Sequence, residues 1–144
     1  NGFQILCEAG LLPGALLHNN NQKFICKNTF LKACSDSAGI TENVNKNKAY
    51  KIPIAHGEGR YYAEIDVVED LFEKDQVLFQ YCDLNGDVSE DDNPNGSLQN
   101  IAGVSNKNKN VMGMMPHPER AVEPLLGNTD GVPLFQSLLN SSKS

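Results

Sequence analysis

The chain has 144 residues, of which 40% are hydrophobic, and it carries 12 Lys and Arg against 18 Asp and Glu, for a formal net charge of −6. This length suits one buried core and is short for two, so we expect one domain, or most of one, over 1–144. The negative charge argues against a nucleic-acid partner, because phosphate-backbone binding needs clustered cations. No apolar run approaches the roughly 20 residues of a membrane span, so we expect a soluble protein with no membrane partner.

The first half of the chain opens with apolar residues at helical spacing and continues with strand-like alternation. Gly10 ends the predicted first helix. The stretch Ser35–Asn47 is rich in Asn, Ser and Lys, which predicts a surface loop. His56-Gly57-Glu58-Gly59 follows the second strand, and its two glycines let the backbone turn or approach a ligand closely. The predicted elements are a helix over 4–9, a turn over 11–16, and strands over 23–31 and 50–55.

The second half carries both helical and strand patterns around a turn-rich acidic stretch. That stretch runs over 83–97 and ends in Asn93-Pro94-Asn95-Gly96-Ser97, whose Pro and Gly predict a tight bend. Strands outnumber helices in the whole chain, which favours an α/β domain with helices at either end of the segment. The predicted elements are a helix over 66–74, a strand over 76–82, strands over 101–104 and 111–115, and a helix over 132–139.

The four cysteines form no C-x-x-C pair and have no histidine at zinc-site spacing, so we expect no metal site. The chain is neither short nor rich in cysteine and carries no signal segment, which favours reduced thiols in the cytosol over disulfides. We interpret each cysteine as structural, because these sequence contexts are typical of buried, unreactive thiols. They are Cys7, Cys26, Cys34 and Cys82.

His117 and Glu119 lie two residues apart, and a proline stands on each side of the histidine. The prolines stiffen the backbone, so both side chains can lean the same way. A histidine that takes a proton from a nucleophile needs its other ring nitrogen held by an acceptor, and a carboxylate does this while stabilising the imidazolium. The pair therefore suits a general base and its orienting residue. On spacing alone, it also suits a solvated turn with a salt bridge.

Five motifs stand in order along nearly the whole chain. Asn1-Gly2-Phe3-Gln4 resembles the residues after the nucleophile in a Cys-Asn-Gly-Phe-Gln elbow, and Met114–Arg120 resembles a His-Pro-Glu box. Between them stand 11–16, 52–59 and 93–97. Together they resemble the glutaminase subunits of phosphoribosylformylglycinamidine synthase, a family of class I (triad) glutamine amidotransferases. The resemblance implies a flavodoxin-like three-layer α/β fold whose N-terminal part is missing.

The same resemblance implies roles for individual residues. His117 would be the general base and acid, Glu119 would orient it, and the nucleophilic cysteine would immediately precede Asn1. The Asn1 amide would donate to the oxyanion, and Gln4 would contact the substrate glutamine. The chain as it stands is then expected to be unable to hydrolyse glutamine, because the attacking sulfur is absent.

The family resemblance also implies partners. Ammonia released from glutamine would pass to a large synthase subunit that makes formylglycinamidine ribonucleotide in purine biosynthesis, with a small third subunit bridging the two. ATP and Mg would be used by the synthase partner, and we expect no cofactor in this subunit, since it has no Gly-rich phosphate loop. The expected location is the cytoplasm.

Two other interpretations stay open. A non-catalytic amidotransferase-like domain could dock onto a synthetase and regulate it, although a decayed site has no reason to retain His117 and Glu119. A related amidotransferase of another pathway is disfavoured by the motifs at 52–59 and 93–97.

Several polar residues remain without a role. His56 could line the pocket or make one hydrogen bond in a surface loop. Glu58 and Arg60 are candidates for contact with the synthase. The turn at 93–97 could dock a partner or serve only as a turn.

Overall fold

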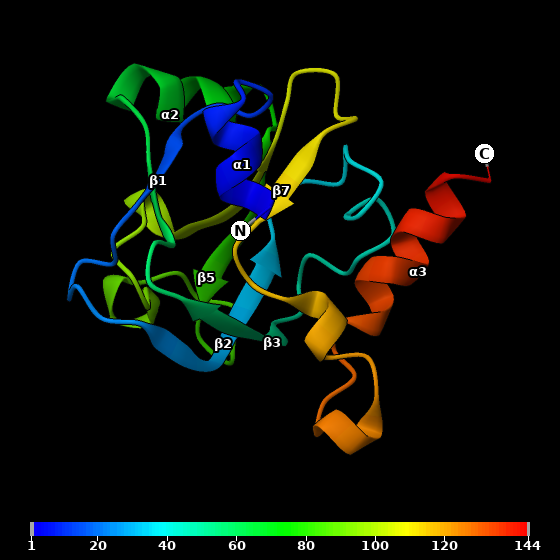
Figure 1. The fold of residues 1–144 in the computed structure, drawn as a ribbon. Coiled ribbons are helices and arrows are strands. Elements are labelled where there is room, and N and C mark those ends of the chain that lie inside the picture. Colours follow the sequence, from blue (N-terminus) through cyan, green and yellow to red (C-terminus); the bar gives the residue numbers. More distant parts are fainter. Residues whose placement is uncertain (1, 144) are drawn as a thin grey trace.

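The computed structural model describes residues 2–143, and Figure 1 shows their arrangement. The predicted helices are confirmed to within a few residues, with Gly10 in the left-handed region after the first one (φ 75°). No helix among the described residues is both long and apolar enough to cross a membrane. The helical elements are α1 (Gly2–Glu8), α2 (Ile65–Glu73), α3 (Val132–Ser141) and the short 3₁₀ turns η1 (Glu90–Asp92), η2 (Leu98–Asn100), η3 (Pro118–Arg120) and η4 (Pro124–Leu126).

The strands form a five-stranded sheet of order β3-β2-β5-β6-β7 and a separate two-stranded pair, β1 with β4. Every pairing within residues 2–143 is antiparallel. The predicted strands all form, whereas β1 and β4 were not predicted. The turn predicted over 11–16 is correct only as far as residue 14, because β1 begins at Ala15. The strands are β1 (Ala15–Leu17), β2 (Ile25–Ala33), β3 (Tyr50–His56), β4 (Arg60–Tyr62), β5 (Val77–Cys82), β6 (Ile101–Ser105) and β7 (Met112–Met114).

Apolar residues gather in two clusters on opposite sides of the sheet. Ile101 belongs to one cluster and its neighbour Ala102 to the other, and successive side chains of a strand point to opposite faces. The cluster of Ile101 contains Phe3 of α1 and residues of α2, whereas that of Ala102 contains Leu134 of α3. The sheet therefore lies between two layers, which confirms the expected α/β class.

The predicted surface loop at Ser35–Asn47 is wrong in its burial. Five of its residues are buried, and three of them belong to the cluster beneath α3. A polar segment can be buried where its polar groups find partners. The partner of this segment is Ser137 of α3. Its hydroxyl donates to the carbonyl of Gly39 (2.7 Å) and accepts from the N–H of Asn43 (2.9 Å). The buried residues are Ser35, Ala38, Ile40, Thr41 and Val44.

Helix α1 packs directly against β7, as Figure 1 shows where the blue helix meets the yellow strand. Gly113 makes this approach possible, because a Cβ at that position would lie 2.6 Å from Cδ1 of Phe3 and 2.8 Å from Cδ1 of Leu12. The Phe3 ring also stacks on Tyr61, with centroids 5.9 Å apart. The missing side chain at 113 thus fixes the start of α1 beside the strand that leads to residue 117.

We predict that Gly113→Ala lowers the free energy of unfolding of the whole protein by about 1–3 kcal/mol, because the added methyl overpacks the contact with Phe3. Denaturant unfolding measures this. Gly57→Ala is the matched control, since its Cβ would meet only a ring carbon of Phe24 at 3.9 Å, and its stability should change by less than about 0.5 kcal/mol. Equal stability of the two variants would contradict the packing argument.

Candidate active site

His117 is held at the edge of the sheet by its own backbone. Its N–H donates to the carbonyl of Pro53 (2.8 Å) in β3, although β3 and β7 are the two edge strands of the sheet. Three residues beyond Met114 span at most about 11 Å, whereas four strand spacings amount to about 19 Å. The sheet must therefore curl until the segment after β7 meets β3. Pro53 fits this place because an edge strand tolerates the missing N–H.

The side chains of His117 and Glu119 are paired as the sequence predicts, with Nδ1 of the imidazole 2.8 Å from Oε1 of the carboxylate. An ionised carboxylate only accepts hydrogen bonds, so Nδ1 carries a proton, and in the neutral form of the ring Nε2 keeps its lone pair. No other hydrogen bond among the described residues reaches the His117 ring. Its side chain is 27% exposed, so the ring is partly open to solvent. The pair has the geometry of a general base with its orienting residue.

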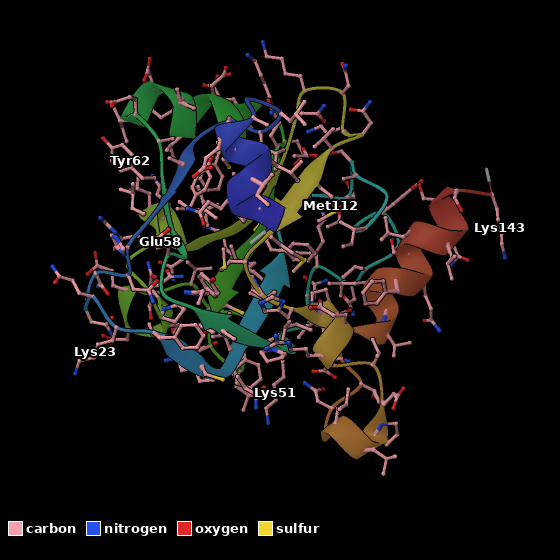
Figure 2. The ribbon with its side chains drawn as sticks, in the orientation of Figure 1. Lys23, Lys51, Glu58, Tyr62, Met112 and Lys143 are labelled. Atoms are coloured by element: carbon pink, nitrogen blue, oxygen red, sulfur yellow. The ribbon has the colours of Figure 1, made fainter. Side chains whose placement is uncertain are left out.

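The start of α1 lies beside the end of β7, from which the chain runs on to His117 (Figure 1). Met112, labelled in Figure 2 at the start of β7, instead packs against the cluster of Ala102, on the other side of the sheet from α1. The tight contact between Phe3 and Gly113 secures this neighbourhood. Asn1, predicted to bind substrate, lies outside the described residues.

Gln4 is half-buried on the first turns of α1 and faces two carboxylates. Its Nε2 donates to Oε2 of Glu58 (2.8 Å) and to Oε1 of Glu8 (3.3 Å). Glu58 also lies 3.4 Å from Nε2 of His18 through its other oxygen, and Arg60 donates from Nε to the carbonyl of His18 (2.9 Å). Glu58 and Arg60, candidates for partner contact from the sequence, thus make contacts within the chain.

His56 at the end of β3 is buried in a network of neutral polar groups. Its Nδ1 lies 3.1 Å from Oδ1 of Asn19, and its Nε2 lies 3.3 Å from Nδ2 of Asn95. An amide nitrogen only donates, so Nε2 accepts and the proton sits on Nδ1. Burial lowers the pKa of His56 to about 4, and the charge of neighbouring His117 acts in the same direction. His56 is therefore an uncharged structural residue next to the candidate base.

The turn at 93–97 serves this network from inside the molecule. Asn95 is fully buried, and its Nδ2 donates to the carbonyl of Gly59 (2.9 Å). Ser97 accepts from the N–H of Tyr61 through its hydroxyl oxygen (3.0 Å). These side chains brace the loop between β3 and β4, so the docking role considered for the turn is not supported by their placement. The role of Asn95 was missed because no short-range pattern connects it to His56, 39 residues away.

No cysteine among the described residues makes a hydrogen bond to His117. The Sγ of Cys7 lies 3.9 Å from the carbonyl of Pro13, and Cys34 approaches Oε1 of Gln80 (3.2 Å). Burial raises the pKa of both thiols to about 11 and that of Cys82 to about 12, so they stay protonated near neutral pH. Within residues 2–143, no group of three or more His, Cys, Asp or Glu is arranged to hold a metal ion.

The chain is similar to a known family of protein domains and to named proteins of that family. Residues 1–131 match the CobB/CobQ-like glutamine amidotransferase domain. The chain is 52% identical over 138 residues to phosphoribosylformylglycinamidine synthase subunit PurQ of Chlorobium luteolum, covering 96% of this chain and 60% of that protein. It is 53% identical over 140 residues to the subunit of the same name from Aquifex aeolicus, covering 97% and 62%.

The solved structure of PurLQS from Thermotoga maritima contains a similar chain, with a TM-score of 0.79 and 46% identity over 96% of this chain and 57% of that one. These likenesses confirm the expected class I glutamine amidotransferase fold. The chain spans about three fifths of the length of the two curated PurQ relatives (60% and 62%).

The neutral state of His56 predicts a pH dependence of stability. Its pKa is about 4 in the folded protein against an ordinary 6.5, so the unfolded chain binds more protons between these values. The free energy of unfolding should therefore fall as pH decreases from about 6.5, by on the order of 2 kcal/mol at about pH 5. Denaturant unfolding of the whole protein at about pH 7.5 and about pH 5 measures this difference.

His56→Asn should flatten that pH dependence, because the replacement does not titrate. His18→Asn is the matched control, since the His18 side chain is 76% exposed, and this variant should keep the full pH dependence. A wild-type slope in His56→Asn would show that another group is responsible.

Proposed function

The chain belongs to the CobB/CobQ-like glutamine amidotransferase family, and from that premise we propose that the whole protein hydrolyses glutamine to glutamate and ammonia. The observation that carries this proposal is the His117–Glu119 pair, whose 2.8 Å hydrogen bond engages Nδ1 and leaves Nε2 without a hydrogen bond among the described residues. A solvated turn or a docking module needs no histidine ring held in one tautomer with its second nitrogen unoccupied.

The proposed nucleophile is a cysteine that immediately precedes Asn1 in the whole protein. His117 first takes the proton of its thiol. The thiolate then attacks the side-chain amide carbon of glutamine, and the imidazolium gives that proton to the departing nitrogen, so that ammonia leaves and a thioester forms. His117 then takes a proton from the water that attacks the thioester, and returns it to the departing sulfur, so that glutamate and the thiol are released. Glu119 keeps the ring oriented and stabilises its protonated form. The proposed oxyanion donor is the amide of Asn1.

The proposal also covers the segment 1–144 when it is produced alone. This segment is expected to show no turnover of glutamine, because Cys7, Cys34 and Cys82 are held protonated by burial and none of them bonds to His117. The thiol of Cys26, on the exposed part of β2, makes no side-chain hydrogen bond within the described region. A chain that carries the cysteine before Asn1 should regain the activity.

For the fate of ammonia we propose transfer to a large synthase subunit that makes formylglycinamidine ribonucleotide in purine biosynthesis, with a small subunit bridging the two. The support is the relatives, which are named as subunits of phosphoribosylformylglycinamidine synthase, and the PurLQS structure. ATP and Mg would act in the synthase, and this chain would need no cofactor of its own. Its cysteines are free rather than paired, which suits a cytoplasmic location.

Replacement of Glu119 tests the catalytic assignment in the whole protein, assembled with its synthase partners. Glu119→Gln should lower kcat for glutamine-dependent synthesis by roughly 10²–10⁴-fold, because the amide neither stabilises the imidazolium nor enforces the tautomer. Synthesis from added ammonia should be unchanged, since it does not use the glutaminase site. Steady-state kinetics with each nitrogen source measures both.

The control for this replacement is Glu69→Gln, the same chemical change on an exposed residue of α2, which should behave as wild type. Full glutamine-dependent activity in Glu119→Gln, or no glutamine hydrolysis by the wild-type assembly, would refute the proposed function.

A further inference from the structure

The side-chain amide of Gln4 has only one orientation open to it. Its two neighbours, Glu58 at 2.8 Å and Glu8 at 3.3 Å, are carboxylates that accept and do not donate, so both must face the NH₂ group. An NH₂ group has two hydrogens, and the two carboxylates use both. The carbonyl oxygen of Gln4 is then its one remaining polar atom, and no hydrogen bond among the described residues reaches it.

Glu58 is the more strongly placed of the two carboxylates. Glu8 is exposed and lies one helical turn from Gln4, where contacts are weak and shared with solvent. Glu58 comes from the loop between β3 and β4, 54 residues away, and its bond to Gln4 is the shorter one. Figure 2 shows Glu58 below Tyr62, on the flank of the molecule that carries β1.

The loop that carries Glu58 is anchored on both sides. Oδ1 of Asn19 accepts from the N–H of Gly59 (3.1 Å), and the N–H of Asn19 donates to the carbonyl of Gly57 (2.9 Å). Nδ2 of Asn95 holds the carbonyl of Gly59. Because the backbone on each side of Glu58 is fixed by buried groups, its carboxylate can hold Gln4 at little further entropic cost.

The charges around Gln4 select the chemistry of a ligand that meets its carbonyl oxygen. An acceptor flanked by two carboxylates suits a cationic donor and repels an anion. The α-ammonium group of a free amino acid is such a donor. A neutral or acidic group in the same place would leave the negative charge uncompensated.

We propose that Glu58 is a positioning residue for the amino-acid substrate, which holds the Gln4 amide with its carbonyl oxygen directed to the substrate's α-ammonium group and adds negative charge behind it. This inference rests on the proposed glutamine hydrolysis. It assigns Glu58 to recognition of the substrate within this chain and not to contact with a synthase.

Loss of Glu58 should therefore weaken glutamine binding without changing the chemical step. In the whole protein assembled with its partners, Glu58→Ala should raise KM for glutamine about tenfold and leave kcat within about twofold. Glu58→Gln retains an acceptor for Gln4 but not the charge, so its KM should lie between those of wild type and Glu58→Ala. Glu42→Ala, an exposed carboxylate with no contact to Gln4, is the control and should match wild type.

A double-mutant cycle separates positioning from any other role of Glu58. If Glu58 acts through Gln4, Glu58→Ala should add little to the rise in KM already caused by Gln4→Ala. Additive effects in the cycle, or an unchanged KM in Glu58→Ala, would overturn the inference while wild-type glutamine hydrolysis keeps the proposed function intact. Weakened assembly with the synthase, with normal KM, would instead assign Glu58 to the partner interface. Failure of wild type to hydrolyse glutamine would remove the proposed function and this inference together.

Discussion

A backbone hydrogen bond from the N–H of His117 to the carbonyl of Pro53 joins the segment after β7 to the opposite edge of the sheet. The bond exists only because the sheet curls, and it places the imidazole next to the end of β3 while α1 remains packed on β7. Pro53 contributes by being a poor strand residue: it has no N–H for a further strand, but its carbonyl is available. The candidate site depends on this closure more than on any side-chain pair.

The network around His56 imposes a second constraint, which is electrical neutrality. A protonated His56 would oppose the imidazolium that His117 must become during the proposed reaction. Burial among amide groups of Asn19 and Asn95 keeps His56 uncharged, so the candidate base has no competing cation beside it. The same groups fix the backbone around Glu58. Polar burial in this network therefore provides both a rigid loop and a suitable electrostatic environment.

The sequence predicted what local patterns encode and missed what is encoded by distant partners. Helices and most strands follow from apolar periodicity, and the His117–Glu119 pair lies within three residues flanked by prolines, so its geometry is nearly local. The segment 35–47 looked like a surface loop because its burial depends on Ser137, far along the chain. The contact between Gln4 and Glu58 likewise joins residues 54 positions apart, and apolar periodicity carries no information about such a distant pair.

The end of β3 links the two halves of the candidate site. Pro53 holds the backbone of His117, and three residues later the chain enters the braced loop from which Glu58 reaches Gln4. Each half uses a carboxylate in the same way, since Glu119 fixes an imidazole and Glu58 fixes an amide. Because β3 anchors both the backbone of His117 and the loop that carries Glu58, a small shift of this strand moves the proposed base and the proposed substrate contact together. Their relative placement, on which proton transfer to a bound amide depends, is thereby preserved.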